Sequence, residues 1–76
     1  MPYRVVVETR TIAGRLMTSL HDDRDDRLAA GRLRLQLRAH LATQGWSVDA
    51  ITHDRDTLSN QALDRVATIA VEELAD

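Results

Sequence analysis

The chain has 76 residues, a formal net charge of −2 and a pI near 5.8, and it contains no cysteine. Without cysteine it can have no disulfide, no thiolate nucleophile and no cysteine-based zinc or iron–sulfur site. All ten basic residues are Arg, which excludes lysine-dependent catalysis as well. The apolar fraction of 43% with 29% charged residues is typical of a folded chain. This length predicts one domain over residues 1–76.

The N-terminal segment Tyr3 to Ile12 is rich in β-branched residues and partly alternates apolar with polar ones, which predicts a strand. Gly14 follows and can supply the positive φ that a tight turn needs. We therefore expect a hairpin whose second strand ends near Leu20. The alternative is that residues 12–20 form a short helix. The polar residues 21–26 are expected to break the chain before the next element.

The segment from Asp26 to Gln44 consists largely of Leu, Ala, Arg and Gln, which are strong helix formers. Carboxylates precede it and Gly45 follows it, as expected at the two ends of a helix. The sequence therefore predicts a helix over residues 26–44.

Two further elements are expected in the C-terminal part. Trp46 to Ile51 is a strand candidate, with residues 53–56 as the turn that follows. Thr57 to Ala75 has apolar residues at helical spacing, which predicts a second amphipathic helix. The resulting fold class is α+β, with a small three-stranded sheet and two helices packed on it in the order β-β-α-β-α.

The first predicted helix carries two apolar stripes when it is projected at about 100° per residue. One stripe is formed by Ala30, Leu33, Leu37 and Leu41. The other lies on roughly the opposite side and is formed by Leu28, Leu35, Ala39 and Ala42. A surface helix needs only one such stripe. Either the sheet and the C-terminal helix cover both faces, or Leu28 and Leu35 belong to a surface that binds a partner.

Positive charge is concentrated in the first part of the chain. Residues 1–45 hold eight Arg and five acids, whereas residues 46–76 hold two Arg and seven acids. Between the two stripes, Arg27, Arg34 and Arg38 fall within an arc of about 80°, together with Arg24 if the helix starts early enough. Such a row can bind phosphate groups of a nucleic acid. It can equally be a solvated face or pair with the acidic C-terminal part.

No catalytic, cofactor or metal site is predicted. The pairs His21-Asp22 and His53-Asp54 are adjacent in sequence, so their side chains diverge instead of converging on one ion. His40 has Gln, not His or Glu, four residues away on either side. Trp46 is expected either in the core or as an anchor at an interface.

We therefore expect a small non-catalytic protein-interaction module, either homodimeric or an accessory regulatory subunit. Its contacts would use Leu28, Leu35, Arg27, Arg34 and Arg38. The alternative is a nucleic-acid-binding regulator that uses the Arg row. No apolar run approaches the roughly 20 residues of a membrane span, and no signal-peptide pattern precedes Tyr3. A cytoplasmic protein with no cofactor and no membrane contact is the expectation.

Overall fold

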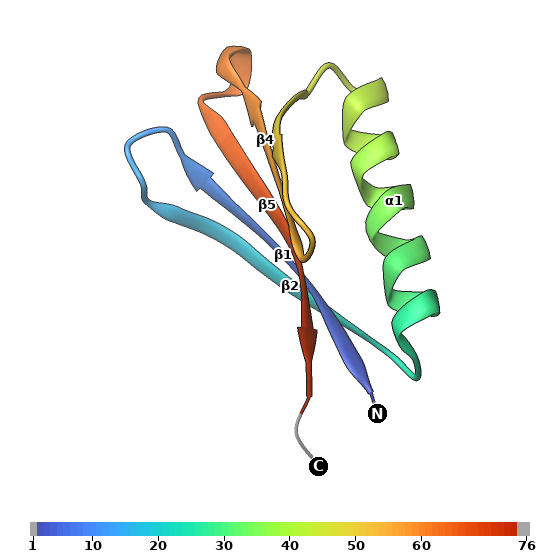
Figure 1. The fold of residues 1–76 in the computed structure, drawn as a ribbon. Helices are drawn as coiled ribbons and strands as arrows, with labels where there is room; N and C mark the ends of the chain where they lie inside the picture. Colours follow the sequence, from blue (N-terminus) through green and yellow to red (C-terminus); the bar gives the residue numbers. More distant parts are fainter. Residues whose placement is uncertain (1, 75–76) are drawn as a thin grey trace.

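A computed structural model describes residues 2–74 of the chain. Five strands form one antiparallel sheet, with the strand order β2-β1-β5-β4-β3. A single α-helix lies on one face of this twisted sheet (Figure 1). The elements in chain order are β1 (Tyr3–Thr11), β2 (Leu16–Arg24), α1 (Arg27–Thr43), β3 (Ser47–Ile51), β4 (Arg55–Asn60), the 3₁₀ turn η1 (Gln61–Leu63) and β5 (Arg65–Glu73).

The predicted three-stranded sheet with two helices is wrong, because the expected C-terminal helix Thr57–Ala75 does not form. Its described part consists of β4, η1 and β5, and Ala75 lies outside the described residues. β5 is the central strand, between β1 and β4. Ala67 and Ile69 are buried on one face of the sheet and Ala70 on the other. β5 carries apolar residues on both sides, so it does not alternate strictly, and the spacing of these residues coincides with that of a helix.

The same segment also contains a tight turn, at residues 60–64, that the predicted helix does not allow for. The Asn60 side chain accepts a hydrogen bond from the Leu63 backbone N–H at 3.2 Å, and Asp64 has a positive φ of 56°. Asn and Asp are the residues that form such local bonds and tolerate the left-handed conformation. This turn reverses the chain between β4 and β5, and β4 pairs along its whole length with residues 65–70 of β5.

The predicted N-terminal hairpin is confirmed, and the alternative helix over residues 12–20 is wrong. Gly14 has a φ of 100°, and its backbone N–H bonds to the carbonyl of Thr11 at 2.8 Å. The second strand is longer than expected, because residues 21–24 continue β2 instead of breaking it. β2 is an edge strand with almost all of its residues exposed, so polar side chains are compatible with it.

The predicted first helix is confirmed, and local capping sets both of its ends. Asp26 is the N-cap, and its side chain accepts the backbone N–H of Ala29 at 2.8 Å. At the other end Gly45 has a φ of 92°. Its N–H bonds to the carbonyl of Ala42, and the N–H of Trp46 bonds to that of Leu41. These two hydrogen bonds together form the Schellman motif, which ends many helices.

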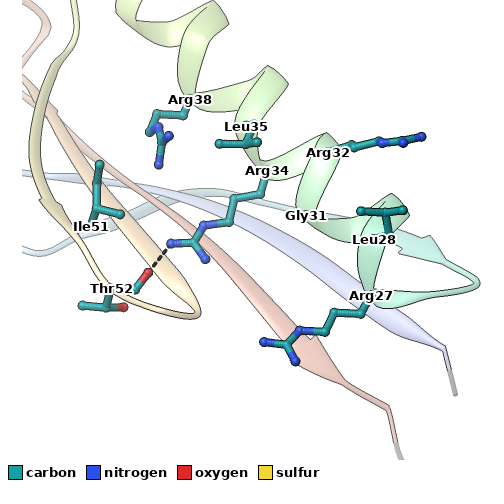
Figure 2. Close-up of a pocket in the computed structure, with 9 residues that line it drawn as sticks. All are labelled: Arg27, Leu28, Gly31, Arg32, Arg34, Leu35, Arg38, Ile51 and Thr52. Atoms are coloured by element: carbon teal, nitrogen blue, oxygen red, sulfur yellow. Dashed lines mark hydrogen bonds between the residues drawn. The ribbon is translucent and has the colours of Figure 1, made fainter.

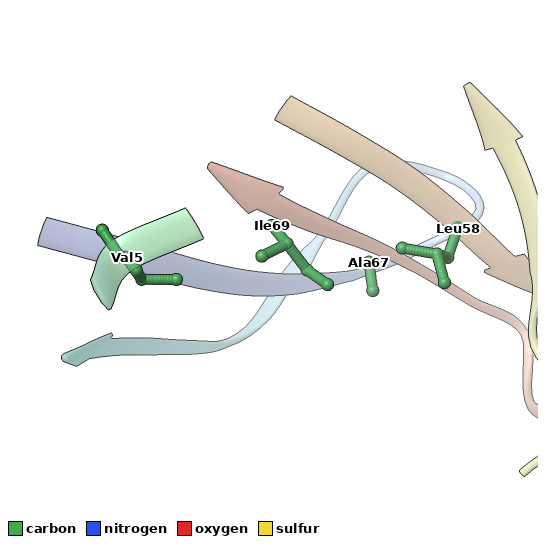
Figure 3. Packing of buried hydrophobic residues seen from close by; sticks show 5 residues of the cluster. Val5, Leu58, Ala67 and Ile69 are labelled. Atoms are coloured by element: carbon green, nitrogen blue, oxygen red, sulfur yellow. The ribbon is translucent and has the colours of Figure 1, made fainter. Parts of the chain in front are cut away.

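The core lies between α1 and the middle of the sheet. Its fully buried members are Val5 on β1, Leu58 on β4, Ala67 and Ile69 on β5, and Ala30 on α1. Figure 3 shows the side chains of the four strand residues along one face of the sheet. The partly buried hydrophobic residues that pack against them are Tyr3, Val7, Leu33, Leu37, Leu41, Trp46 and Val71. The first predicted stripe of the helix is therefore its core face.

Candidate functional site

The second apolar stripe of α1 remains uncovered. Its two large side chains, Leu28 and Leu35, are 66% and 53% exposed. Residues 57–75 would have covered it in the first of the two predicted alternatives, but over their described part they form no α-helix and belong mainly to β4 and β5. No other element within residues 2–74 packs on this side of α1.

An open groove of about 650 Å³ runs between α1 and the end of β3. Most of its surface is apolar. It is lined by Arg27, Leu28, Gly31, Arg32, Arg34, Leu35, Arg38, Ile51 and Thr52 (Figure 2). All five residues predicted as the partner-binding set lie in this lining. The structure thus brings them together with a third exposed apolar side chain, Ile51, which is 58% exposed.

One wall of the groove is fixed by a buried ion pair. Asp56 on β4 has no exposed surface, and Arg34 donates two hydrogen bonds to its carboxylate, from Nε at 3.0 Å and from Nη2 at 2.8 Å. Arg38 adds a third at 3.2 Å. The Arg34 guanidinium also bonds to the backbone carbonyls of Thr52 and His53. Figure 2 shows it reaching from α1 across to Thr52. Arg34 therefore ties the helix to the β3–β4 turn.

The charges around Asp56 determine its protonation state. Burial on its own raises the pKa of this carboxyl group, because it removes water from the charged form. The hydrogen bonds and positive charges of Arg34 and Arg38 outweigh burial, so the pKa of Asp56 lies below its ordinary value. The same hydrogen bond raises the pKa of the Arg34 guanidinium, because it stabilises the charged form of both partners. The pair is ionised at neutral pH.

The predicted Arg row is therefore divided into two kinds of residue. Arg34 and Arg38 are engaged inside the fold by Asp56. Arg27 is exposed at the groove, and within residues 2–74 no carboxylate pairs with it. Arg24 does not belong to the helix. It lies at the end of β2 and pairs with Asp22 at 3.0 Å.

Several groove residues were not predicted from the sequence. Arg32 lies outside the projected Arg arc, and it too is exposed and without a carboxylate partner among the described residues. Ile51 was placed in a strand, but nothing in the sequence indicated that this strand is at an edge of the sheet. Gly31 could have been singled out from the sequence, because glycine is unfavourable in the middle of a helix. Asp56 does not line the groove but holds Arg34 and Arg38. The sequence predicts a turn at this residue, and its burial follows only from strand pairing.

The two His-Asp pairs do not form a site. His21 and Asp22 are successive residues of the exposed strand β2, so they point to opposite faces of the sheet. His53 and Asp54 lie 3.9 Å apart in the β3–β4 turn, where both are exposed. In residues 2–74 no group of three or more His, Cys, Asp or Glu is arranged to hold a metal ion.

Two other singled-out residues also have local roles. His40 lies 3.2 Å from the side-chain amide nitrogen of Gln44 on the exposed face of the helix. Trp46 is partly buried and packs against the core cluster, which is the first of its two predicted roles. Neither residue lines the groove.

Comparison of the chain with protein-family models, with curated proteins and with solved structures found no match. Over the part of the chain that the structure describes, no helix is long and apolar enough to cross a membrane.

Proposed function

We propose that this chain is a protein-interaction module that binds a protein partner through the groove between α1 and β3. The observation that supports the proposal is the convergence of three large exposed apolar side chains, Leu28, Leu35 and Ile51, on one groove. Isolated exposed hydrophobic residues are common on protein surfaces. A contiguous apolar surface with a polar rim is typical of a binding site.

The rigid arrangement of the groove supports the same function. Its helix is capped at both ends and packed on the sheet, and the Arg34–Asp56 pair fixes its position relative to the β3–β4 turn. A partner would therefore meet a preformed surface and would not have to order it, which favours affinity.

The alternative function, nucleic-acid binding by the Arg row, has weaker support. Arg34 and Arg38 direct their guanidinium groups at Asp56, which leaves Arg27 and Arg32 as the exposed charges of the groove. The surface between them is mostly apolar and offers phosphate groups few donors. Removing Arg34 and Arg38 would also break the buried ion pair. The pair Arg27→Ala with Arg32→Ala is therefore the better test of phosphate binding.

The proposed function is tested by photo-cross-linking in the cells that produce the protein. A photoreactive amino acid replaces Leu35 in the groove. In a matched control it replaces Leu63, which is 58% exposed in the β4–β5 turn. We expect a defined product from position 35 that is absent from position 63. Mass spectrometry would identify it as a second copy or as another protein.

Competition separates specific binding from random contact. Excess unmodified wild-type chain should suppress the product. Excess Leu35→Asp chain should not, because the substitution removes an apolar contact and places in the interface a carboxylate that must lose its water on binding. Equal cross-linking from both positions contradicts the proposal. So does a chain that yields no product and remains a strict monomer at all concentrations in sedimentation experiments.

A further inference from the structure

The groove exists because the sheet is wider than its single helix. Five strands about 4.8 Å apart span roughly 19 Å, whereas a helix with its side chains is about 10 Å wide. α1 packs mainly on β1 and β5 and contacts the edge strand β3 little, so the residues of β3 stay exposed. On β3, Val48 lies opposite Leu58 and Ile51 lies opposite Asp56. Leu58 and Asp56 face the helix, so Val48 and Ile51 point to the same face of the sheet, and both are exposed. The uncovered strip has room for one more helix beside α1.

The charged residues that line the groove itself are all Arg. α1 contains no Asp or Glu among its 17 residues, and four of its Arg line the groove. Asp56 compensates one of these four charges, and Asp54 and Glu73 lie in the neighbouring hollow that Arg27, Gly31 and Arg34 also line. The groove therefore carries an excess of positive charge around an apolar floor, and it is complementary to a partner that combines apolar side chains with carboxylates.

A second copy of the chain fits this surface poorly. A two-fold contact between helices places the same patch of each copy against the other. Arg27 and Arg32 of one copy would then face those of the second, and neither helix supplies an acid. Pairing through the β3 edges avoids this repulsion, but it separates the two helices by about 24 Å or more. Packed helices lie about 8–10 Å apart, so the groove would stay open.

Gly31 gives this side of α1 its shape. At about 100° per residue it projects between Leu28 and Arg27, toward the groove. A Cβ atom built there would meet nothing within 4 Å, and no positive φ requires glycine at this position. Nothing within the described chain therefore accounts for a residue that weakens the helix. Its missing side chain leaves space in which a second helix can approach the backbone of α1 closely.

We infer that the groove binds an acidic amphipathic helix of another protein. The apolar residues of that helix contact Leu28, Leu35 and Ile51, and its carboxylates pair with Arg27 and Arg32. It lies on the uncovered strip of the sheet beside α1, with its closest approach at Gly31. This inference rests on the proposed function, because it specifies the partner of the same groove.

A displayed peptide library tests the inference. Each peptide is an amphipathic helix with apolar residues at i, i+3, i+4 and i+7 and with the flanking positions randomised over Glu, Gln and Lys. The library is selected against the wild-type chain.

The binding of the selected peptides is then measured on three variants of the chain: Gly31→Leu, which fills the groove, Arg32→Glu, and Arg15→Glu. Arg15→Glu makes the same charge change in the β1–β2 turn, away from the groove. Circular dichroism confirms that each variant is folded.

The inference predicts that Glu is enriched over Lys at the flanking positions. It also predicts that Gly31→Leu and Arg32→Glu each weaken binding about tenfold or more, while Arg15→Glu changes it little. If the selected peptides are not enriched in Glu, or if they bind Arg32→Glu as tightly as the wild-type chain, the inference that the partner is acidic is wrong. If Gly31→Leu still abolishes their binding, the groove remains a protein-binding surface.

Three other results overturn the inference in different ways. A library that yields no binder of any charge overturns both the inference and the proposed function. Self-association of the wild-type chain that Gly31→Leu abolishes assigns the groove to a second copy. Binding of a labelled DNA duplex that Arg32→Glu abolishes, with no peptide bound, assigns it to nucleic acid.

Discussion

At the scale of single residues, Asp56 is the charged side chain that the fold buries completely in the part of the chain that the structure describes. A buried carboxylate is tolerated only when hydrogen bonds and opposite charge replace the water that it loses. Arg34 and Arg38 supply both, and no buried side-chain polar atom among residues 2–74 lacks a hydrogen-bond partner. The pair joins α1 to β4, so its loss should destabilise the whole domain.

Asp56→Asn should lower the free energy of unfolding by about 3–5 kcal/mol at pH 7, because Arg34 would remain largely buried without a counter-charge. Urea denaturation measures this loss. Asp49→Asn makes the same chemical change at an exposed position of β3 and should have little effect. A similar small loss for both variants would show that the ion pair contributes little to stability.

The difference between wild type and Asp56→Asn should also depend on pH. The pKa of Asp56 is lowered in the folded state, so its contribution to stability is fully present above the pKa of an unfolded aspartate, about 3.9. It is lost as the pH falls from there through the lower pKa of the folded state. Repeating the urea series between pH 7 and pH 2 should therefore show the two stabilities converging only below about pH 4. Convergence at higher pH would contradict a lowered pKa.

At the scale of elements, two glycines of the same helix region are expected to behave in opposite ways. Gly31 lies inside α1 with ordinary helical geometry and open space around it, whereas Gly45 ends the helix with a φ of 92°. Gly31→Ala should raise the free energy of unfolding by up to about 1 kcal/mol, because alanine is the better helix former. Gly45→Ala should lower it by about 1 kcal/mol or more, because a Cβ atom is strained at positive φ.

Chemical denaturation of the two variants checks this pair of predictions. A destabilising effect of Gly31→Ala would mean that the helix backbone at residue 31 requires glycine for a reason internal to the fold. That result would remove one support for the close approach of a partner. A neutral Gly45→Ala would show that the chain can end α1 without the Schellman motif.

At the scale of the whole molecule, the chain is flat and somewhat extended. Its principal extents are 39 × 23 × 17 Å and its radius of gyration is 12.4 Å, compared with about 11.4 Å for a compact chain of this length. One helix on five strands shields the middle of one face of the sheet from solvent and leaves the strands at both edges exposed. The edge strands β2 and β3 are exposed almost throughout, whereas β5 supplies three of the buried apolar residues.

Native-state hydrogen exchange should reproduce this gradient. The hydrogen-bonded amides of β5, which is paired on both sides, should exchange about a hundredfold more slowly than those of β2 and β3. Exchange measured by NMR in the isolated protein checks the order. Equal protection across all five strands would indicate that the edges are covered in solution, and the groove would then not be free.

The composition and local pattern of the chain were sufficient for some of these features. The N-terminal hairpin around Gly14 and the helix with its caps at Asp26 and Gly45 were predicted correctly, because turns and caps depend on residues close together in the chain. The two apolar stripes of that helix were also predicted, since helical geometry alone places Leu28 and Leu35 opposite the core face.

Other features were decided only by tertiary structure. The strand β5 could not be distinguished from a helix by spacing, because Val66 and Ala70 on one of its faces and Ala67, Ile69 and Val71 on the other recur at helical intervals. The burial of Asp56, the division of the Arg row and the contribution of Ile51 to the groove all depend on which strands become neighbours. Strand pairing joins residues far apart in the chain, and local residue preferences do not specify it. The sequence by itself therefore determined that α1 has an apolar face beyond the one the core uses. Only the tertiary structure decided that this face stays open beside a positively charged groove.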